Sequence, residues 1–403
     1  MSRDGGGLAS NRPAKATAFR FVLMVGILSF FADFPYEGAR SALGPFLASL
    51  HASGAAVGIV TGFGEFLGYA LRLGSGRLAD ATRQYWPITI CGYVVQMAAV
   101  PALALVDGWP MAAVLIVLER VGRAIRSPPR DTMLSHAGQQ LGGYGWVFGL
   151  HEAMDQLGAM FGPLAVAAVL AHRGDYRSAF AILLLPALIC LALVLATRLA
   201  YPRPQDLERH PQPVSAEGLP RLYWVYLGAA ALVALGFADY PLVAYHFGRA
   251  ATVPAADIAR FYAVAMAVSG AGSLAFGRLF DRFGFSVLIA LTVLSALFAP
   301  LVFLGGFWLA LLGTAIWGLG TGVHESIIPA ALAPMAPAAR RASAYGLFTA
   351  LYGTFWFLGS ALIGILYDVS PAAAAGFCVA AQIAAIPFLV WVARRAQKAQ
   401  MSA

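Results

Sequence analysis

The chain has 403 residues, of which 60% are hydrophobic and only 11% are charged, and its mean hydropathy is +0.73. A soluble domain carries about 25% charged residues, so this composition excludes a soluble protein and indicates an integral membrane protein. The net charge of +8 does not indicate a nucleic-acid binder, because the basic residues lie scattered between apolar runs.

Long apolar runs recur along the whole chain. A run of about 20 residues is enough for one transmembrane helix, whereas a barrel strand has only about 10. We therefore expect an all-α membrane protein with twelve transmembrane helices. The first run is expected to remain as a helix, because no cleavage site of small residues follows it. The predicted spans are 19–48, 54–76, 86–106, 110–128, 144–171, 177–199, 221–247, 256–279, 284–304, 307–333, 342–367 and 372–393.

The distribution of basic residues predicts the orientation. If the N-terminus is cytoplasmic, most of the 27 Lys and Arg residues fall in cytoplasmic segments, including the run from Arg120 to Arg130. This bias predicts that both termini are cytoplasmic. Arg far outnumbers Lys, which is typical of a high-GC bacterial genome, so we expect a multi-pass protein of the plasma (inner) membrane.

Sequence motifs recur in the two halves of the chain. FADFP at 31–35 matches FADYP at 237–241, and GRLAD at 76–80 matches GRLFD at 277–281. Parallel repeats of six helices are typical of transporters, whose substrate site lies between the repeats. A duplicated membrane protein without transport is the alternative. The predicted organisation is two pseudo-symmetric six-helix bundles, 1–200 and 221–403, joined by a polar, proline-rich cytoplasmic linker at 201–220.

These repeated motifs resemble the loop signature of the major facilitator superfamily, over essentially the whole chain. The resemblance implies a cytoplasmic gate after the second and eighth helices, where glycine permits a tight turn and aspartate pairs with a base or a helix N-terminus. An ordinary charged turn is the alternative. The predicted gate residues are Gly76, Asp80, Arg83, Gly277, Asp281 and Arg282.

The fifth helix carries Gly158, Gly162 and Pro163, which are similar to the G-x-x-x-G-P core of drug–proton antiporters in that superfamily. This resemblance implies a bacterial antiporter-like subgroup and export. Close helix packing through small residues is the alternative. Arg120 in the fourth helix matches the arginine of another signature of the superfamily.

Ionisable residues inside the spans are the candidates for coupling, because charge is costly in a bilayer. Asp33, Glu37 and Arg40 share one face of the first helix, and Pro35 within this stretch is expected to open the local backbone. We expect Glu37 and Arg40 to neutralise each other, which leaves Asp33 free to titrate. A buried salt bridge that only orients the helix is the alternative. In the seventh helix, Asp239 and His246 occupy the corresponding positions.

Other spans add further candidates. Glu65 has no basic neighbour on its own helix and is predicted to carry a proton. His151 and Asp155 are predicted to form a proton relay or a polar contact between helices. Their segment lacks the second histidine of the HExxH zinc motif, so they do not indicate a zinc hydrolase. The remaining candidates are His324 and Glu325, expected to face a polar region, and the possible cavity aromatics Tyr36, Tyr240, Tyr352 and Trp356.

The sequence thus predicts a secondary transporter that works by alternating access, with proton-coupled export of a small organic solute. The alternatives are a proton-coupled importer and a transporter of a metal cation or chelate, since the polar candidates include hard and borderline ligands. No nucleophile–base pair, nucleotide loop or filter repeat indicates an enzyme or a channel. We expect no cofactor, no resident metal and no nucleic acid, and a functional monomer whose partners are protons, the solute and the bilayer.

Overall fold

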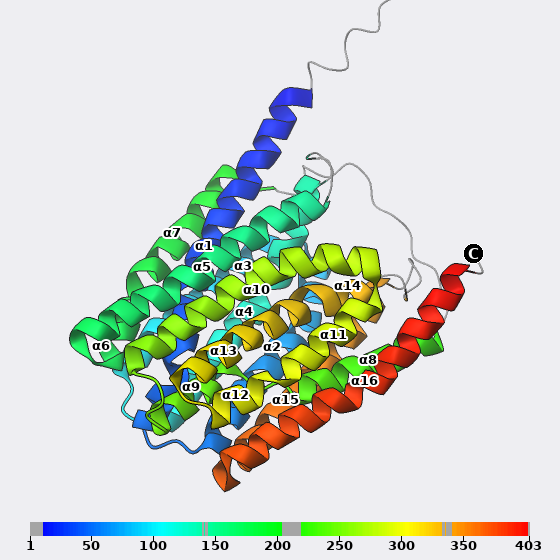
Figure 1. Cartoon of the computed structure of the whole chain (residues 1–403). Coiled ribbons are helices and arrows are strands. Elements are labelled where there is room, and N and C mark those ends of the chain that lie inside the picture. The colour runs from blue at the N-terminus through cyan, green and yellow to red at the C-terminus, as the bar shows by residue number, and fades with distance from the viewer. Residues whose placement is uncertain are drawn as a thin grey trace, which may run out of the picture.

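The computed structural model describes residues 11–138, 141, 144–203, 219–332, 335 and 341–401, and within them it contains helices and no strand. Figure 1 shows their arrangement. The helices are α1 (Asn11–Ser49), α2 (Gly54–Thr82), α3 (Tyr85–Ala102), η1 (Leu103–Leu105), α4 (Trp109–Gly138), α5 (Tyr144–Arg173), α6 (Tyr176–Ala181), α7 (Leu184–Ala200), α8 (Arg221–Leu235), α9 (Tyr240–Arg249), α10 (Ala255–Phe283), α11 (Phe285–Ala296), α12 (Phe298–Leu304), α13 (Phe307–Gly322), η3 (Val323–Ile327), α14 (Ile328–Leu332), α15 (Arg341–Val369) and α16 (Pro371–Met401).

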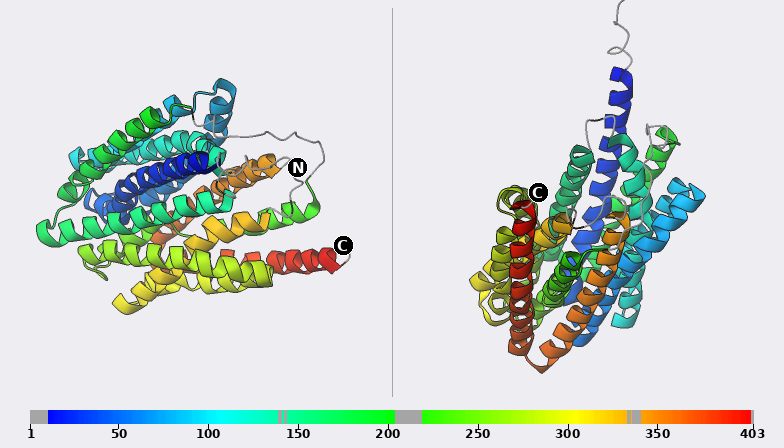
Figure 2. Two further views of the ribbon diagram at one scale, coloured as in Figure 1. Left: turned by 90° about the horizontal axis from the view of Figure 1, so that it is seen from above. Right: turned by 90° about the vertical axis from the view of Figure 1, so that its right-hand side faces the viewer.

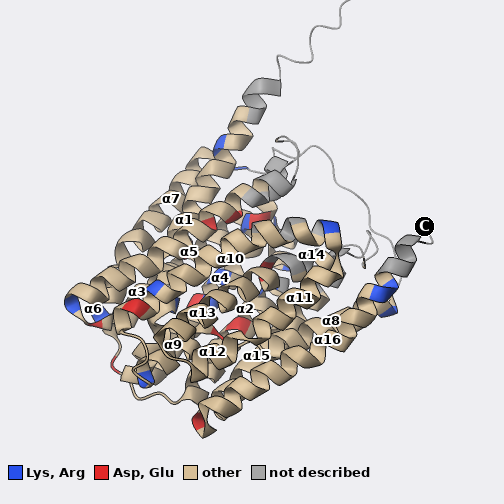
Figure 3. Cartoon of the chain, in the orientation of Figure 1, with Lys and Arg blue, Asp and Glu red and all other residues tan. Residues whose placement is uncertain are grey.

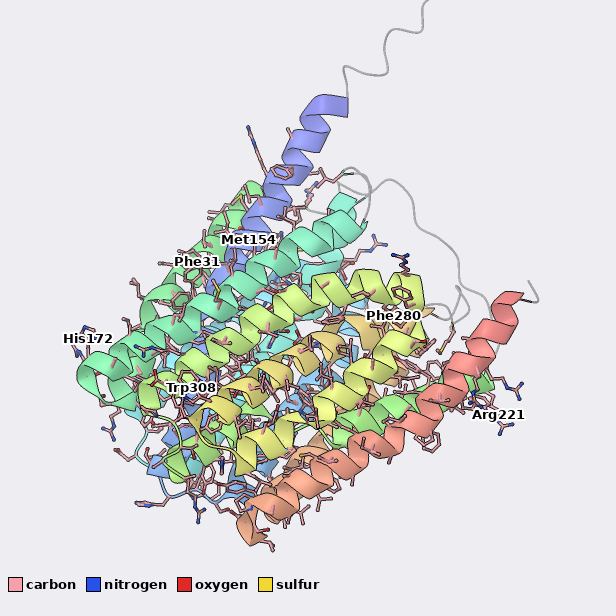
Figure 4. All side chains as sticks on the ribbon, viewed as in Figure 1. Phe31, Met154, His172, Arg221, Phe280 and Trp308 are labelled. Carbon is pink, nitrogen blue, oxygen red and sulfur yellow. The ribbon has the colours of Figure 1, made fainter. Side chains whose placement is uncertain are left out.

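Each predicted span falls on one helix or on consecutive helices. Among the described residues, 10 helical stretches are long and apolar enough to cross a membrane. The other two long helices, α4 and α10, have 30 and 29 residues. Side chains on the outside are apolar: Trp308, labelled in Figure 4, is 76% exposed and stands beside the exposed Leu309 and Leu312.

Several spans are interrupted rather than straight. The seventh is broken between α8 and α9, where Gly236 ends α8 and Asp239 precedes α9. The tenth contains a π-helical turn, η3, between α13 and α14, and π turns in helices are frequent at functional sites. By contrast, α1 continues through Pro35, so the expectation that this proline opens the backbone is wrong.

The two halves of the chain, α1 to α7 and α8 to α16, meet mainly along three pairs of helices. In the first half α1 packs against α5, and across the halves α2 packs against α15, α5 against α10 and α1 against α9. Figure 2 shows α15, in orange, crossing toward the blue and cyan helices of the first half. The GxxxGP glycines serve the α1–α5 contact, because a Cβ at Gly158 or Gly162 would collide with the α1 backbone.

Contacts between the halves are close at the end opposite the N-terminus, which we call the distal end (residues 44–60, 240–253 and 360–370). A Cβ at Gly44 would overlap the Pro241 carbonyl, and one at Gly58 would overlap the backbone of α15. The Asp368 carboxylate accepts hydrogen bonds from Gly54 N and Ala55 N, each 2.8 Å long. The last turn of α15 therefore caps the first turn of α2.

The predicted gate motif is not a loop. α2 continues through Gly76 to Thr82 and ends at Arg83, whose φ is 54° and ψ 20°. The corresponding Gly284 ends α10 with φ 59°. The tight turn thus comes seven residues after the first glycine of each motif, and the expectation of a turn at Gly76 is wrong. The side chains of Asp80 and Asp281, and linker residues 204–218, lie outside the described residues. Gly277 lies within α10, and Arg282 is exposed in its last turn.

Candidate functional site

A network of ion pairs lies inside the protein and joins both halves of the chain. Figure 3 shows red and blue residues among the central helices, surrounded by uncharged ones. The described members are drawn mainly from α1, α2 and α4, and Asp239 comes from the second half. Because buried charges are costly unless they are paired and hydrogen-bonded, this network defines the candidate site.

Arg40 is the centre of the network. Its guanidinium lies 3.8 Å from Glu37, 3.6 Å from Glu65 and 3.3 Å from Asp239. The three carboxylates come from α1, from α2 and from the break before α9. Tyr262 of α10 donates a hydrogen bond to Glu37. The Arg40–Asp239 ion pair and the Tyr262–Glu37 hydrogen bond therefore both connect the two halves of the chain.

Glu65 has basic partners, although the sequence predicted a carboxylate without one. Arg120 of α4 lies 2.9 Å from its carboxylate, in addition to Arg40. The prediction considered only neighbours along α2, where no basic residue lies within a turn. Glu65 is therefore a shared acceptor between α1 and α4.

Asp33 is not free either. Arg126 lies 3.2 Å from Asp33, and Arg123 lies 3.9 Å away. Arg126 also donates to Gln96 (2.6 Å), which in turn donates to Glu119 (3.0 Å). The expected Glu37–Arg40 pair exists, but the conclusion that it leaves Asp33 without a partner is wrong.

The sequence did not identify most of the charged residues of α4 as members of the site. Arg120 and the residues up to Arg130 were assigned to a cytoplasmic segment, but Arg126 is 1% exposed and lies inside α4. Glu119 and Arg123 were also left out of the candidates. The spacing of three or four residues between these charges places them on one helix face, and that pattern could have identified them.

A second polar chain lies between α1, α4 and α5. Ser29 Oγ lies 2.6 Å from His151 Nε2 and receives a hydrogen bond from Arg130 (3.3 Å). His151 Nδ1 lies 3.6 Å from Asp155, which confirms the predicted pair. Ligand atoms of His151, Glu152 and Asp155 lie within 4.8 Å of one another, but the Arg130 guanidinium beside Ser29 opposes a cation there.

Residues at the π turn have two different surroundings. His324 is buried, bonded to the Tyr352 hydroxyl, with Trp356 and Phe237 against its ring. Glu325 next to it is exposed. His324 therefore packs among aromatic rings rather than facing an open polar region, and the prediction for Glu325 stays a prediction.

The three remaining candidates are two tyrosines and a histidine, and they lie away from the π turn. The guanidinium carbons of Arg120 and Arg123 lie 4.7 and 4.3 Å from the centre of the Tyr36 ring, so Tyr36 belongs to the site. Tyr240 is fully buried and donates to a backbone carbonyl, so it is a packing residue. His246 contacts the Tyr367 hydroxyl at the distal end.

Comparisons with known proteins agree with one another. The family model described as Major Facilitator Superfamily matches residues 25–304. An uncharacterized protein of Mycobacterium tuberculosis is 41% identical over 370 residues, which cover 90% of each chain. An uncharacterized MFS-type transporter of Methanocaldococcus jannaschii is 30% identical over 141 residues, 35% of each chain.

Solved transporter structures share the fold. A mutant of the nucleoside transporter NupG superposes with a TM-score of 0.75 at 15% identity, covering 91% of this chain and 99% of that one. A POT family transporter with a bound peptide conjugate superposes with a TM-score of 0.73 at 14% identity, covering 94% and 96%. At this level of identity, the comparison concerns the fold alone.

Proposed function

The chain belongs to the Major Facilitator Superfamily, and from this premise we propose that it is a twelve-span secondary transporter that exchanges protons for a small organic solute and exports it. The family and the transporter folds indicate a transporter rather than an enzyme. The twelve spans would form two six-helix bundles, 1–200 and 221–403, that alternate access to one site. The protein would act as a monomer in the inner membrane, with both termini cytoplasmic.

The assignment of twelve spans adds α4 and α10 to the 10 apolar stretches. At about 1.5 Å per residue, either helix is about 45 Å long and exceeds the hydrocarbon core of about 30 Å. The charges of α4 are paired with Asp33 and Glu65 inside the protein rather than exposed to lipid. Its low hydropathy is therefore compatible with a membrane span.

Proton coupling is supported chiefly by the three acids around Arg40. The Arg40 guanidinium cannot pair equally well with Glu37, Glu65 and Asp239. Protonation of one of these acids therefore strengthens the pairing of Arg40 with the other two. Only Asp239 belongs to the second half. Protonation of Asp239 would weaken a bond between the halves, which links proton binding to their separation.

Export rests on the resemblance of Gly158, Gly162 and Pro163 to the antiporter core. A vesicle experiment tests exchange independently of how the protein inserts. A screen of small organic compounds for thermal stabilisation first supplies a solute. Proteoliposomes with an acidic interior should then accumulate it, because outward proton flow drives inward movement of the solute.

Two results would contradict parts of this proposal. Accumulation only in vesicles with an alkaline interior would establish proton symport and favour the importer. Accumulation insensitive to the gradient would exclude proton coupling. We expect Asp239→Asn to bind the solute without gradient-driven accumulation, while Asp257→Asn remains active, because Asp257 pairs with Arg260 in an exposed (i, i+3) contact.

Transport of a metal cation or chelate is a second candidate, favoured by the grouping of His151, Glu152 and Asp155. If it is correct, a divalent ion such as Zn²⁺ or Mn²⁺ should raise the melting temperature of the wild type but not of Asp155→Asn. A shift of the same size in both proteins would eliminate this grouping as the site.

A further inference from the structure

A small internal cavity lies between α1, α3 and α4, beside the Arg40 network. Its volume is about 10 Å³, and most of its wall is apolar, formed by α1, α3 and α4 side chains such as Leu43, Ala99 and Ile116. Four polar residues complete the wall: Tyr36, Arg40, Glu119 and Arg120. A cavity of about this volume accommodates one water molecule.

Three of these polar residues carry an atom with no partner in the described structure. The atoms are the Tyr36 hydroxyl and the Nε atoms of Arg40 and Arg120. Their residues are 2%, 8% and 4% exposed, so bulk water does not reach them. A buried polar atom without a partner costs about 1–3 kcal/mol, so three at one cavity call for a ligand.

Glu119 defines the chemistry of that ligand. Its carboxylate lies 3.6 Å from Arg120 Nε, which is too long for a direct hydrogen bond. Two Nε–H groups supply donors, while the Glu119 carboxylate and the Tyr36 oxygen supply acceptors. This set of two donors and two acceptors matches the four hydrogen bonds of a water molecule, whereas an anion would be repelled by Glu119.

We propose that one water molecule binds in this cavity, accepts hydrogen bonds from Arg40 and Arg120, and donates to Glu119 and Tyr36. The water then links the Glu119 carboxylate to Tyr36 and Arg40, in addition to the described contacts of that carboxylate with Gln96 and Arg120. It thereby holds Glu119 beside the Arg40 network. This water site does not rest on the proposed function.

Structure determination in lipid nanodiscs, at a resolution that shows ordered water, tests the site directly. One compact density peak should lie within hydrogen-bonding distance of both Nε atoms. Absence of a peak, while waters are visible elsewhere in the core, would overturn the proposal. A lowered melting temperature when chloride is replaced by gluconate, or an anomalous bromide peak, would identify an anion and would also overturn it.

A pair of variants tests the site without a substrate. Ala99→Val fills the cavity with carbon and leaves the three polar atoms without a partner, whereas Ala99→Ser offers a hydroxyl in place of the water. We expect Val to lower the melting temperature clearly more than Ser, and more than Ala112→Val, which overpacks a fully buried alanine elsewhere on α4. Equal effects of Val and Ser would count against a bound water.

Glu119→Gln tests the acceptor that we assign to the water, because it keeps the shape of the side chain and one oxygen that accepts. The density peak should persist in this variant. Loss of the peak in Glu119→Gln would overturn the proposed hydrogen bonds of the water. The peak decides the water site whether or not the protein proves to couple solute movement to protons.

Discussion

Removal of the Asp368 carboxylate should weaken the contact between the two halves at the distal end of the protein. In Asp368→Ala, Gly54 N and Ala55 N lose the acceptor that the second half provides. Capping a helix N-terminus is worth about 1 kcal/mol, and a carboxylate there adds about 0.3–1 kcal/mol through the helix dipole. Because Asp368 is exposed, we take the sum as about 1–2 kcal/mol, which shifts the closed–open equilibrium at this end by a factor of about 5–30.

The separation of the halves is measured as a distance distribution between two spin labels. Ser49→Cys, at the distal end, and Ala372→Cys, two residues beyond it in α16, place the labels on exposed positions, one in each half, after the exposed Cys91 is changed to serine. The distance distribution of Asp368→Ala should contain a larger long-distance population than that of the parent. Asp368→Asn should give a smaller increase, because the amide oxygen still accepts one hydrogen bond.

Ser53→Ala is the matched control. Ser53 caps the same helix by accepting from Ala56 N at 3.1 Å, but this bond lies within one half. Its loss should lower the melting temperature and leave the distances unchanged. Equal distance distributions in Asp368→Ala and the parent, or an equal increase in Ser53→Ala, would refute the idea that the bond between the halves controls closure.

Three further predictions concern backbone and surface positions. Gly44→Ala should prevent distal closure and abolish transport, whereas Gly68→Ala, with open space around its Cβ, should stabilise α2 by up to about 1 kcal/mol in denaturant unfolding. Arg83→Gly should raise the melting temperature, because a non-glycine residue at φ 54° costs about 1 kcal/mol; a lower value would contradict this. Hydrogen bonds from Ser178 hold the pKa of Asp175 below its usual 3.8, so the stability lost in Asp175→Ala should be full at neutral pH and vanish as pH falls through that lowered pKa; a pH-independent difference would contradict it.

The sequence predicted the positions of the helices well, because lipid requires long apolar runs with internally satisfied backbones. It also identified acids that the structure brings to one place. It could not identify their partners. Asp33 and Arg126 are 93 residues apart, and Arg40 and Asp239 are 199 apart, so only the packing of α1 against α4 and α9 reveals these pairs.

Breaks within helices were predicted less well, for local physical reasons. Pro35 leaves α1 continuous, whereas the twin motif at 237–241 stands at a break. Gly236 ends α8, and its carbonyl receives a hydrogen bond from Gln382 of α16. The similar sequences adopt different conformations because their neighbours differ, and neighbours are not visible in a short motif.

The charges of α4 also constrain how the protein is made. A basic or acidic residue at the centre of a helix costs about 2.5–3.5 kcal/mol when the helix enters the membrane from the translocon. Glu119, Arg120 and Arg126 lie in the part of α4 that is buried in the fold, so this helix inserts poorly by itself. Its partners Asp33 and Glu65 are synthesised earlier, in α1 and α2. In the proposed twelve-span topology, we therefore expect α1 and α2 to remain beside the translocon until α4 emerges and pairs with them.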